Sequence, residues 1–552
     1  MSTFRPTVCP TSVKPLVLAL LTGLAGQASA FTFQDENISG SLDSTITAGI
    51  GVRTENPACP LVLSGASGAG APSGCATVAS GLGDQGTLNY AKGDAFTTYL
   101  KGTHELLLKL PSDVKFMARA SWLKDLSATT TTDYVSAGNP AGVGNLTGDA
   151  KDDLSFKARL LDFWVSKEFE VGEQRARVRV GNQVISWGES LFIPGGINQV
   201  NAMDLMRLSQ PGTQLKEVFL PAPIVSVAAG LGGGFNAEAY VQAKWNANYY
   251  PPTGSFWSVV NGLGRGHQAY GLAQGSARKD GQYGAALRWQ PEGTQLNLGL
   301  YGMAYHDKAA QFSYNLDGTG AAGWAFPEDR RMFGVSANFP LGDWAIGSEL
   351  SYRPRDAVSL NPASGCAGTN GNCYVDERKF QWHLTGTLSL TPSEHGAILN
   401  ALGGAQTATL MLEAVAIKYP NLKHFYNGVP VGAGAWGWGV EADASSSALP
   451  AGTKTSWGYN LDFSWVYDGT VINGWQVIPE IFYFQAVKGR TPTTTATFME
   501  GAKSANFIVS FVQNPASWQF AVNYAKFWGG DSRFDQPYKD RDFIGAYVSR
   551  NF

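Results

Sequence analysis

The chain has 552 residues, of which 15% are charged and 12% aromatic, and it carries 66 glycines and a formal net charge of −3. This charge balance offers no basic footprint for nucleic acid. Beyond the first thirty residues no segment has 18 consecutive apolar residues, which argues against a helical membrane protein. Few charges and many aromatics favour a surface in contact with lipid. No linker or shift in composition marks a domain boundary, so we expect one continuous architecture.

Residues 1–30 have the three parts of a secretory signal peptide. Basic Arg5 and Lys14 come first, the apolar run LVLALLTGLAG follows at 16–26, and Ala28-Ser29-Ala30 ends the segment. The apolar run is too short to span a bilayer. We therefore expect cleavage after Ala30 and a mature chain, 31–552, outside the cytoplasm; a buried N-terminal helix is the alternative.

The stretch SWGYNLDFSWVY, residues 456–467, alternates large apolar and small polar side chains. A period of two predicts an extended strand with two different faces. Aromatic residues lie at both ends of the apolar face, whereas Leu461 and Phe463 hold its middle. This order is typical of a strand that crosses a bilayer between two aromatic girdles, with Asn460 and Asp462 turned toward water.

The same alternation recurs along the chain and predicts about eighteen antiparallel strands. The predicted ranges are 41–53, 95–110, 114–124, 154–170, 175–186, 223–231, 235–246, 280–290, 294–306, 331–339, 344–353, 378–391, 407–418, 456–467, 475–487, 503–513, 518–528 and 541–552.

The connections between these ranges alternate between short and long. Tight turns occur at 110–113, 171–174, 291–293 and 340–343, and the segments between them reach about 41 residues. This layout predicts an all-β fold, a transmembrane outer-membrane β-barrel with both termini on the periplasmic side. A large soluble all-β protein is the alternative.

The last strand, RDFIGAYVSRNF, ends in Phe552, with Val548, Ala546 and Ile544 in register with it. This arrangement resembles the C-terminal recognition strand of outer-membrane proteins. Arg550 departs from the pattern, because an apolar or aromatic residue is usual there.

Four cysteines of the expected mature chain form two close pairs in Gly- and Pro-rich stretches. Cys59 with Cys75, and Cys366 with Cys373, predict two disulfides that staple loops of an exported protein. A metal site is the alternative, although no C-x-x-C or neighbouring His supports it. We expect no cofactor.

Residues 181–223 carry the most unusual sequence, with Gln183-Val184-Ile185-Ser186-Trp187-Gly188-Glu189-Ser190 at its start and Gly195-Gly196-Ile197-Asn198 following. This resembles the signature of a proteobacterial outer-membrane family catalogued as a domain of unknown function. The likeness extends through Pro252-Thr253-Gly254-Ser255-Phe256-Trp257 and Glu349-Leu350-Ser351-Tyr352-Arg353. It implies a barrel encoded beside a periplasmic partner and an RND-superfamily inner-membrane transporter, with traffic of hydrophobic molecules such as steroids, terpenes or lipids.

A connection as long as 187–222 is usually functional. We hypothesise that it folds inward as a constriction with a substrate site built from Trp187, Glu189, Asp204 and Arg207, and with Met203, Leu205 and Met206 as its apolar part. A surface loop without ligand is the alternative. Arg175, Arg177 and Arg179 share one strand face and are expected to line the lumen, where they bind substrate or pair with carboxylates across the pore.

No motif for covalent chemistry stands out. Six scattered histidines lack ligand spacing, and Gly318-Thr319-Gly320-Ala321-Ala322-Gly323 matches G-x-G-x-x-G outside any βαβ context. A hydrolase would need a clustered nucleophile, base and acid, which the sequence does not indicate. We therefore expect a channel or transport component for hydrophobic or amphipathic molecules rather than an enzyme.

Two other functions stay open. One is a non-selective porin, and the other is a scaffold for an envelope transport complex, with the turn 391–407 as the place where a partner docks. The expected partners are outer-membrane lipid, a hydrophobic small molecule, a periplasmic protein and the RND transporter, without nucleic acid.

Overall fold

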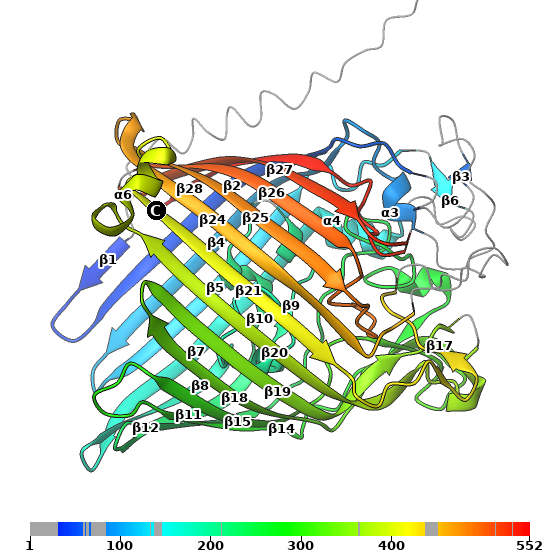
Figure 1. Ribbon diagram of the computed structural model, residues 1–552, viewed down its shortest axis with the longest axis horizontal. Helices are drawn as coiled ribbons and strands as arrows, with labels where there is room; N and C mark the ends of the chain where they lie inside the picture. The colour runs from blue at the N-terminus through cyan, green and yellow to red at the C-terminus, as the bar shows by residue number, and fades with distance from the viewer. Residues whose placement is uncertain are drawn as a thin grey trace, which may run out of the picture.

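A computed structural model describes residues 31–58, 61, 66–67, 84–132, 134–136, 146–210, 212–362, 365–435, 451–513, 515–532 and 534–552. Its main feature is a closed antiparallel barrel of eighteen strands (Figure 1). The strands are β2 (Ser39–Arg53), β4 (Ala95–Leu110), β5 (Val114–Asp125), β7 (Phe156–Val171), β8 (Gln174–Gln183), β11 (Ala222–Gly232), β12 (Phe235–Gln242), β14 (Gln282–Trp289), β15 (Asn297–Tyr305), β18 (Arg330–Leu341), β19 (Trp344–Ser359), β20 (Tyr374–Leu390), β21 (Thr407–Lys418), β24 (Thr455–Ile472), β25 (Trp475–Lys488), β26 (Ala502–Gln513), β27 (Trp518–Gly529) and β28 (Phe543–Asn551).

Each strand pairs with the next one along the barrel, and the last strand pairs with the first. The closing register runs from Thr45 opposite Asn551 to Arg53 opposite Phe543. The short strand β1 (Phe31–Gln34) extends the edge of β2 beyond this seam. All eighteen strands expected from the alternation are confirmed, although some ends differ from the expected range, by as much as six residues at the end of β19. Closure pairs the first of these strands with the last.

Smaller elements belong to the connections. They are β3 (Ala66–Ser67), α3 (Gln85–Leu88), β6 (Val135–Ser136), α4 (Gly148–Ser155), η1 (Ile197–Val200), β9 (Ala202–Met203), η2 (Arg207–Ser209), α5 (Leu215–Val218), β10 (Phe219–Leu220), η3 (His267–Tyr270), β13 (Ala273–Gln274), β16 (Gln311–Leu316), β17 (Ala321–Ala325), η5 (Ala367–Thr369), α6 (Pro392–Ala401), β22 (Phe425–Tyr426) and β23 (Val429–Pro430). Within the described part of the chain, no helix has the length and apolar character needed to cross a membrane.

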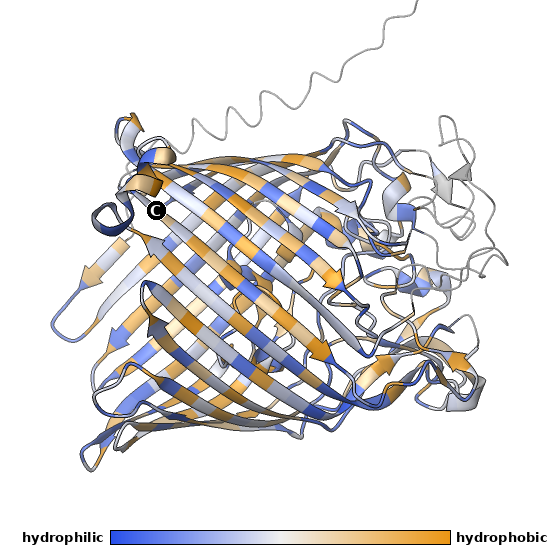
Figure 2. Cartoon of the chain, in the orientation of Figure 1, coloured by the Kyte–Doolittle hydropathy of each residue, from blue (hydrophilic) through white to orange (hydrophobic). Residues whose placement is uncertain are grey.

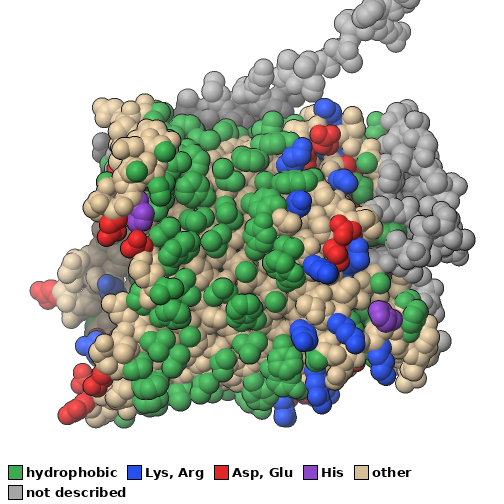
Figure 3. All heavy atoms as spheres, viewed as in Figure 1, with side chains coloured by type: hydrophobic (Ala, Val, Ile, Leu, Met, Phe, Trp, Pro, Cys, Tyr) green, Lys and Arg blue, Asp and Glu red, His purple; other side chains and the backbone are tan. Residues whose placement is uncertain are grey.

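The outer surface of the barrel is apolar. Figure 2 shows orange and blue residues alternating along the strands, and Figure 3 shows hydrophobic side chains over the middle of the visible face, with charges gathered toward its ends. On β24, Trp457 is exposed, whereas Asn460 is 6% exposed and lies opposite Glu413 of β21. The wall is closed, its outer face is apolar, and polar groups lie on its inner face. These features place the chain in the outer membrane.

This alternation makes a direct prediction for β27. Val522 points outward in the middle of the strand and is 49% exposed, whereas Asn523 points inward and donates to Asn506 at 2.8 Å. We expect Val522→Arg to lower the free energy of unfolding by about 2–4 kcal/mol, because a charge at the bilayer midplane loses its hydration. Urea titration of the protein refolded in lipid vesicles measures the change. Asn523→Arg is the matched control, since its charge enters the water-filled lumen. An equal loss of unfolding free energy at both positions would contradict the assignment of faces.

The two ends of the barrel differ. The short turns, α6 and the C-terminus lie at one end, which is the periplasmic end of an outer-membrane barrel, and the long connections lie at the other (Figure 1). Among the long connections, the 360–373 segment carries the predicted disulfide between Cys366 and Cys373, with a Cα–Cα distance of 5.4 Å. Cys59 and Cys75 lie outside the described residues, as do residues 1–30 with the expected signal peptide.

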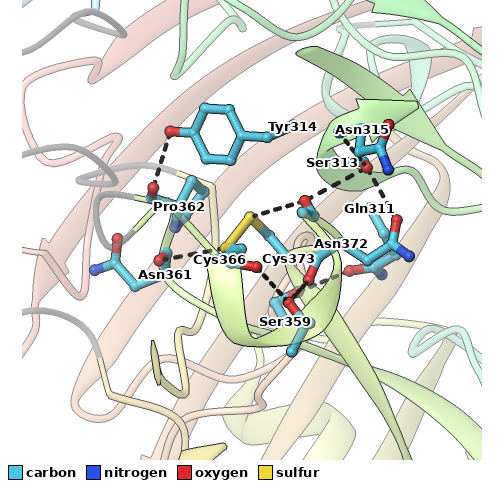
Figure 4. Close-up of a disulfide and its surroundings, with 12 residues drawn as sticks. Gln311, Ser313, Tyr314, Asn315, Ser359, Asn361, Pro362, Cys366, Asn372 and Cys373 are labelled. Carbon is cyan, nitrogen blue, oxygen red and sulfur yellow. Dashed lines mark hydrogen bonds between the residues drawn. A yellow bond between two sulfur atoms is a disulfide. The ribbon is translucent and has the colours of Figure 1, made fainter. Parts of the chain in front are cut away.

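The disulfide closes its own loop, and hydrogen bonds fasten that loop to a neighbouring hairpin (Figure 4). Cys373 N–H donates to the carbonyl of Phe312 at 2.9 Å, and the Tyr314 hydroxyl donates to the carbonyl of Pro362 at 2.9 Å. Both partners belong to the β16–β17 hairpin. The disulfide and these hydrogen bonds together tie the loop to the outer rim of the barrel, and the disulfide contradicts the metal alternative for this pair.

Arg550, which departed from the terminal pattern, lies between two aromatic rings. Its guanidinium carbon is 4.8 Å from the centre of the Trp518 ring and 5.3 Å from that of Phe552. Cation–π contact lets a charged side chain occupy a position where an apolar one is usual.

Candidate functional site

The connection between β8 and β11, residues 184–221, turns into the barrel. Its elements β9 and β10 pair with each other and lie inside the wall of strands (Figure 1). Tyr249, from the following connection, supports them: its N–H donates to the Met203 carbonyl at 2.9 Å, and its carbonyl accepts from Leu205 N–H at 3.0 Å. We call residues 184–221 the inner loop. The prediction that this segment folds inward agrees with the structure.

Glu349 of β19 is the first anchor of the inner loop. Its carboxylate is 1% exposed and accepts the N–H groups of Glu189 at 2.6 Å and Ile197 at 2.9 Å. Gly188 and Gly196 let the backbone approach this closely, since an added Cβ would lie 2.2 Å and 1.9 Å from the two carboxylate oxygens. Charge-assisted hydrogen bonds of this kind are about twice as strong as neutral ones.

Glu413 of β21 is the second anchor. One of its oxygens accepts the N–H groups of Phe192 at 2.6 Å and Ile193 at 2.8 Å, and the other meets His383 Nδ1 at 2.7 Å. Gln381 Nε2 contacts His383 Nε2 at 2.8 Å and also donates to the carbonyl of Pro194 at 3.1 Å. Both Glu413 and His383 are fully buried, so the loop seals this part of the wall from water.

The far side of the inner loop is held by ion pairs to β4 and β7. Glu217 binds Lys101 Nζ at 2.6 Å and the Thr103 hydroxyl at 2.6 Å, and Asp204 pairs with Arg159. Burial raises the pKa of Glu217, but Lys101 and Thr103 outweigh it, and the pKa falls below its ordinary value. Arg207 lies between the two carboxylates, 3.9 Å from Asp204 and 3.7 Å from Glu217.

The structure divides the predicted constriction residues between two groups. Trp187 packs on Tyr240 and Tyr301 and donates to Glu238 at 2.7 Å, while the Glu189 carboxylate accepts from Ser336 and Asn338 at 3.1–3.2 Å. Asp204 and Arg207 belong to the ion-pair group on the other side of the lumen. The four side chains do not come together in one site, because the inner loop crosses the lumen between them.

The apolar part of the inner loop packs against other loops. Leu205 packs against a buried cluster that includes Trp324 and Tyr419, and Met206 packs against the cluster of Tyr90 and Phe256. Met203 is half-buried.

The three arginines of β8 face inward, in agreement with the alternation. Arg179 lies over the Trp164 ring, 4.2 Å from its centre, and Arg177 is directly opposite Glu168 of β7. Arg175 is exposed near the short-turn end. These side chains form a ladder on the lumen wall; their role in substrate binding stays a prediction.

One part of the lumen wall is free of polar attachment to the inner loop. Among the described residues, the loop's hydrogen bonds and ion pairs go to β4, β7, β12, β14 and β18–β21, and none reaches β24–β27. The loop meets the remaining wall through apolar contacts, with the Phe192 and Phe482 rings 5.4 Å apart and Gly212 beside the Tyr547 ring.

Several inward side chains of this free wall stay partly exposed, unlike the fully buried anchors, and so does Met411 of the adjoining strand β21. Those on β24–β27 are Asp462, Ser464, Ile478, Glu480, Phe482, Asn506, Ile508 and Asn523. We call this surface the passage wall. Because it mixes apolar and polar groups along one face, a path beside it suits a molecule with both kinds of surface.

The histidines do not form hydrolytic groups with the residues that the structure describes. His104 Nδ1 lies 3.0 Å from the Ser44 hydroxyl, but Trp122 donates to Nε2 at 3.1 Å, so Nδ1 carries the proton and cannot activate the serine. His383 has an orienting acid in Glu413, yet its second nitrogen meets Gln381 rather than a nucleophile. Asp343, Glu394 and His395 bring ligand-type atoms within 4.8 Å of one another at the exposed periplasmic end, and we assign no metal role to them.

One hollow lies on the outer face of the wall. It has a volume of about 800 Å³, and Ala237, Ala239, Ala285 and Gly302 line its base, with Leu300 and Phe333 among the larger side chains around it. Acyl chains fill such a surface in a bilayer, and we place no site there.

Comparison with known proteins gives a family and a set of barrels. The model of the family described as "Protein of unknown function (DUF1302)" matches residues 13–552. No curated protein matches the chain.

Several solved porin-type structures resemble it at low identity. Acinetobacter baumannii OccAB1 is 11% identical, with a TM-score of 0.43 over 95% of this chain and 99% of that chain. A BenF-like porin from Pseudomonas fluorescens is 10% identical, with a TM-score of 0.44 over 93% and 98%. Pseudomonas aeruginosa OccK2 (OpdF), solved in complex with glucuronate, is 11% identical, with a TM-score of 0.42 over 93% and 98%.

Proposed function

We propose a function from the premise that this chain belongs to the family described as a protein of unknown function (DUF1302), whose model covers nearly its whole length. The protein is an outer-membrane channel that passes hydrophobic or amphipathic molecules, of steroid, terpene or lipid type. The observation that carries the proposal is the narrowed lumen, in which an inner loop leaves one partly exposed wall of mixed apolar and polar side chains.

The constriction favours selective passage over general diffusion. An unobstructed barrel of 16–18 strands holds a wide aqueous channel. Here Phe192 and Phe482 meet where the inner loop approaches the passage wall, and Ile478 and Ile508 lie on the same wall. A rigid apolar surface beside hydrogen-bonding groups binds the two parts of an amphipathic solute, whereas a strongly hydrated sugar gains little there.

A role within a multi-protein transport path is the second candidate. Helix α6 projects from the periplasmic end, and its Ile398 is 49% exposed. An apolar side chain outside the membrane region fits contact with a periplasmic protein that links this barrel to an RND-superfamily transporter. Copurification of such a protein with the wild type, and its loss with Ile398→Asp, would support this role.

Uptake into proteoliposomes tests the channel. The probes are a steroid glycoside, which crosses lipid slowly, and a trisaccharide of similar mass. We expect the purified protein to speed entry of the glycoside over protein-free vesicles and to leave the trisaccharide outside. Equal entry of both would identify a non-selective porin, and entry of neither would contradict the proposal.

A further inference from the structure

Two carboxylates face the lumen from neighbouring strands of the passage wall. Asp462 of β24 lies opposite Phe482 of β25, and Glu480 of β25 lies opposite Ser464 of β24. Asp462 and Glu480 therefore hold diagonal positions on one face of the sheet, where Cα atoms are about 7–8 Å apart. At this spacing two ionised carboxylates repel each other.

Within the part of the chain that the structure describes, neither carboxylate has a protein partner. Among the described residues, no hydrogen bond or ion pair reaches the side chain of Asp462 or Glu480, and the buried Oδ1 of Asp462 has no donor. Other lumen carboxylates are paired: Glu105 and Asp162 bind Arg119 at 2.7 Å and 2.5 Å, and Glu238 binds Arg288 at 2.9 Å.

A third polar group beside the carboxylates is also unsatisfied. Asn460 shares the inward face of β24 with Asp462, is only 6% exposed, and its Oδ1 meets no donor in the described part of the chain. Leaving a buried acceptor without a donor costs about 1–3 kcal/mol, and an unpaired carboxylate costs more. Three acceptors on one wall therefore offer a place for a ligand that donates hydrogen bonds and carries positive charge.

Apolar side chains lie beside these acceptors on the same wall. Met411 of the neighbouring strand β21 lies opposite Asp462, and Ile508 of β26 lies opposite Glu480. The ring of Phe482 meets that of Phe192 in the inner loop edge to face, with the ring centres 5.4 Å apart, which brings the acidic pair to the constriction itself. A calcium ion requires six or more oxygen ligands, which is more than these three side chains supply. An ammonium group donates only three hydrogen bonds. Its organic part can then lie against the apolar side chains.

We propose that Asp462 and Glu480, together with Asn460, bind the cationic head of an amphipathic organic amine at the constriction, with its apolar part against Phe482, Met411 and Ile508. This inference rests on the proposed channel and names one chemical class that it recognises. The site attracts the ammonium group by charge, and the neighbouring aromatic ring adds a cation–π contribution.

Three probes with the same apolar chain isolate the contribution of the head group. Hexylammonium, hexanol and hexanoate are titrated into detergent-solubilised protein by calorimetry, and each is added to single channels in a planar bilayer. We expect hexylammonium to bind and to reduce the current at concentrations at least about tenfold below the other two. The double variant Asp462→Asn/Glu480→Gln should lose this preference.

Asp162→Asn is the matched control, because it removes one lumen carboxylate that already has a partner. Unchanged hexylammonium binding in the double variant, or an equal loss in Asp162→Asn, would overturn the site. The two assays separate the failures: a wild type that binds the amine yet passes neither ions nor the steroid glycoside contradicts the channel, whereas a conducting wild type without amine preference contradicts the site alone.

Discussion

Replacing residues 195–210 by a short Gly-Ser linker is expected to raise the single-channel conductance by a factor on the order of three or more, because a barrel of this strand number holds a wide aqueous lumen when nothing fills it. The replacement removes η1, β9 and η2, and with them the contacts to Arg353 and Arg159. It also removes the Met203 carbonyl to which Tyr249 donates. Planar-bilayer recording in one molar KCl measures the change.

The control for this variant shortens a connection outside the lumen. Residues 317–320 form the exposed tip between β16 and β17, so replacing them should leave the conductance as it is in the wild type. Equal conductance of the wild type and the 195–210 replacement would show that the inner loop does not narrow the pore.

Glu349→Gln is expected to loosen the inner loop without removing any of its residues. An amide has one acceptor oxygen, so its NH2 group would face the N–H of Glu189 or Ile197, donor against donor. Leaving one buried donor unpaired costs about 1–3 kcal/mol, which raises the population of states with the loop detached by roughly fivefold to a hundredfold. In bilayer recordings this change appears as brief openings to the larger conductance of the loop replacement.

The matched control is Glu170→Gln, an exposed glutamate at the periplasmic end of β7. It should give recordings like those of the wild type. If neither variant shows brief openings to the larger conductance, the Glu349 carboxylate does not hold the loop.

The barrel could be predicted from sequence because its wall obeys a local rule. From Trp457 to Ser464 of β24, each large apolar residue is followed by a small one that is mostly polar, and a period of two assigns both faces without knowledge of the neighbouring strands. Turn chemistry at 340–343 and at the other short connections then fixed the up-and-down order. Arg550 departs from this alternation because a charged residue occupies an apolar position. The alternation could not explain it, since the ring that Arg550 contacts belongs to Trp518 of another strand.

The anchors of the inner loop could not be predicted from the sequence, because they depend on contacts between residues that are far apart along the chain. Glu349 and Glu413 are 160 and 221 residues from the backbone groups that they bind. Alternation shows that each points inward, but it does not show which segment of the lumen each one meets. The glutamate in the apolar strand LMLEAVAIK, Glu413, was the one visible signal, since a buried carboxylate in such a strand requires a partner.

The division of the predicted constriction residues has the same origin. Trp187 and Glu189 belong to the start of a loop that crosses the lumen, whereas Asp204 and Arg207 follow the crossing. Similarly, the position of Asp462 in β24 predicts that it faces water. Whether a basic side chain lies beside it depends on the residues that β21, β25 and β26 place around it, which the sequence of β24 does not show.

The most direct test of the membrane barrel is the accessibility of spin labels placed singly at each position from Tyr459 to Ser464. In lipid vesicles, we expect labels at 459, 461 and 463 to collide mainly with dissolved oxygen, which concentrates in the bilayer, and labels at 460, 462 and 464 to collide mainly with a water-soluble nickel chelate. A profile without this period of two, or one in which all six positions meet the chelate equally, would contradict a strand that separates lipid from a wet lumen.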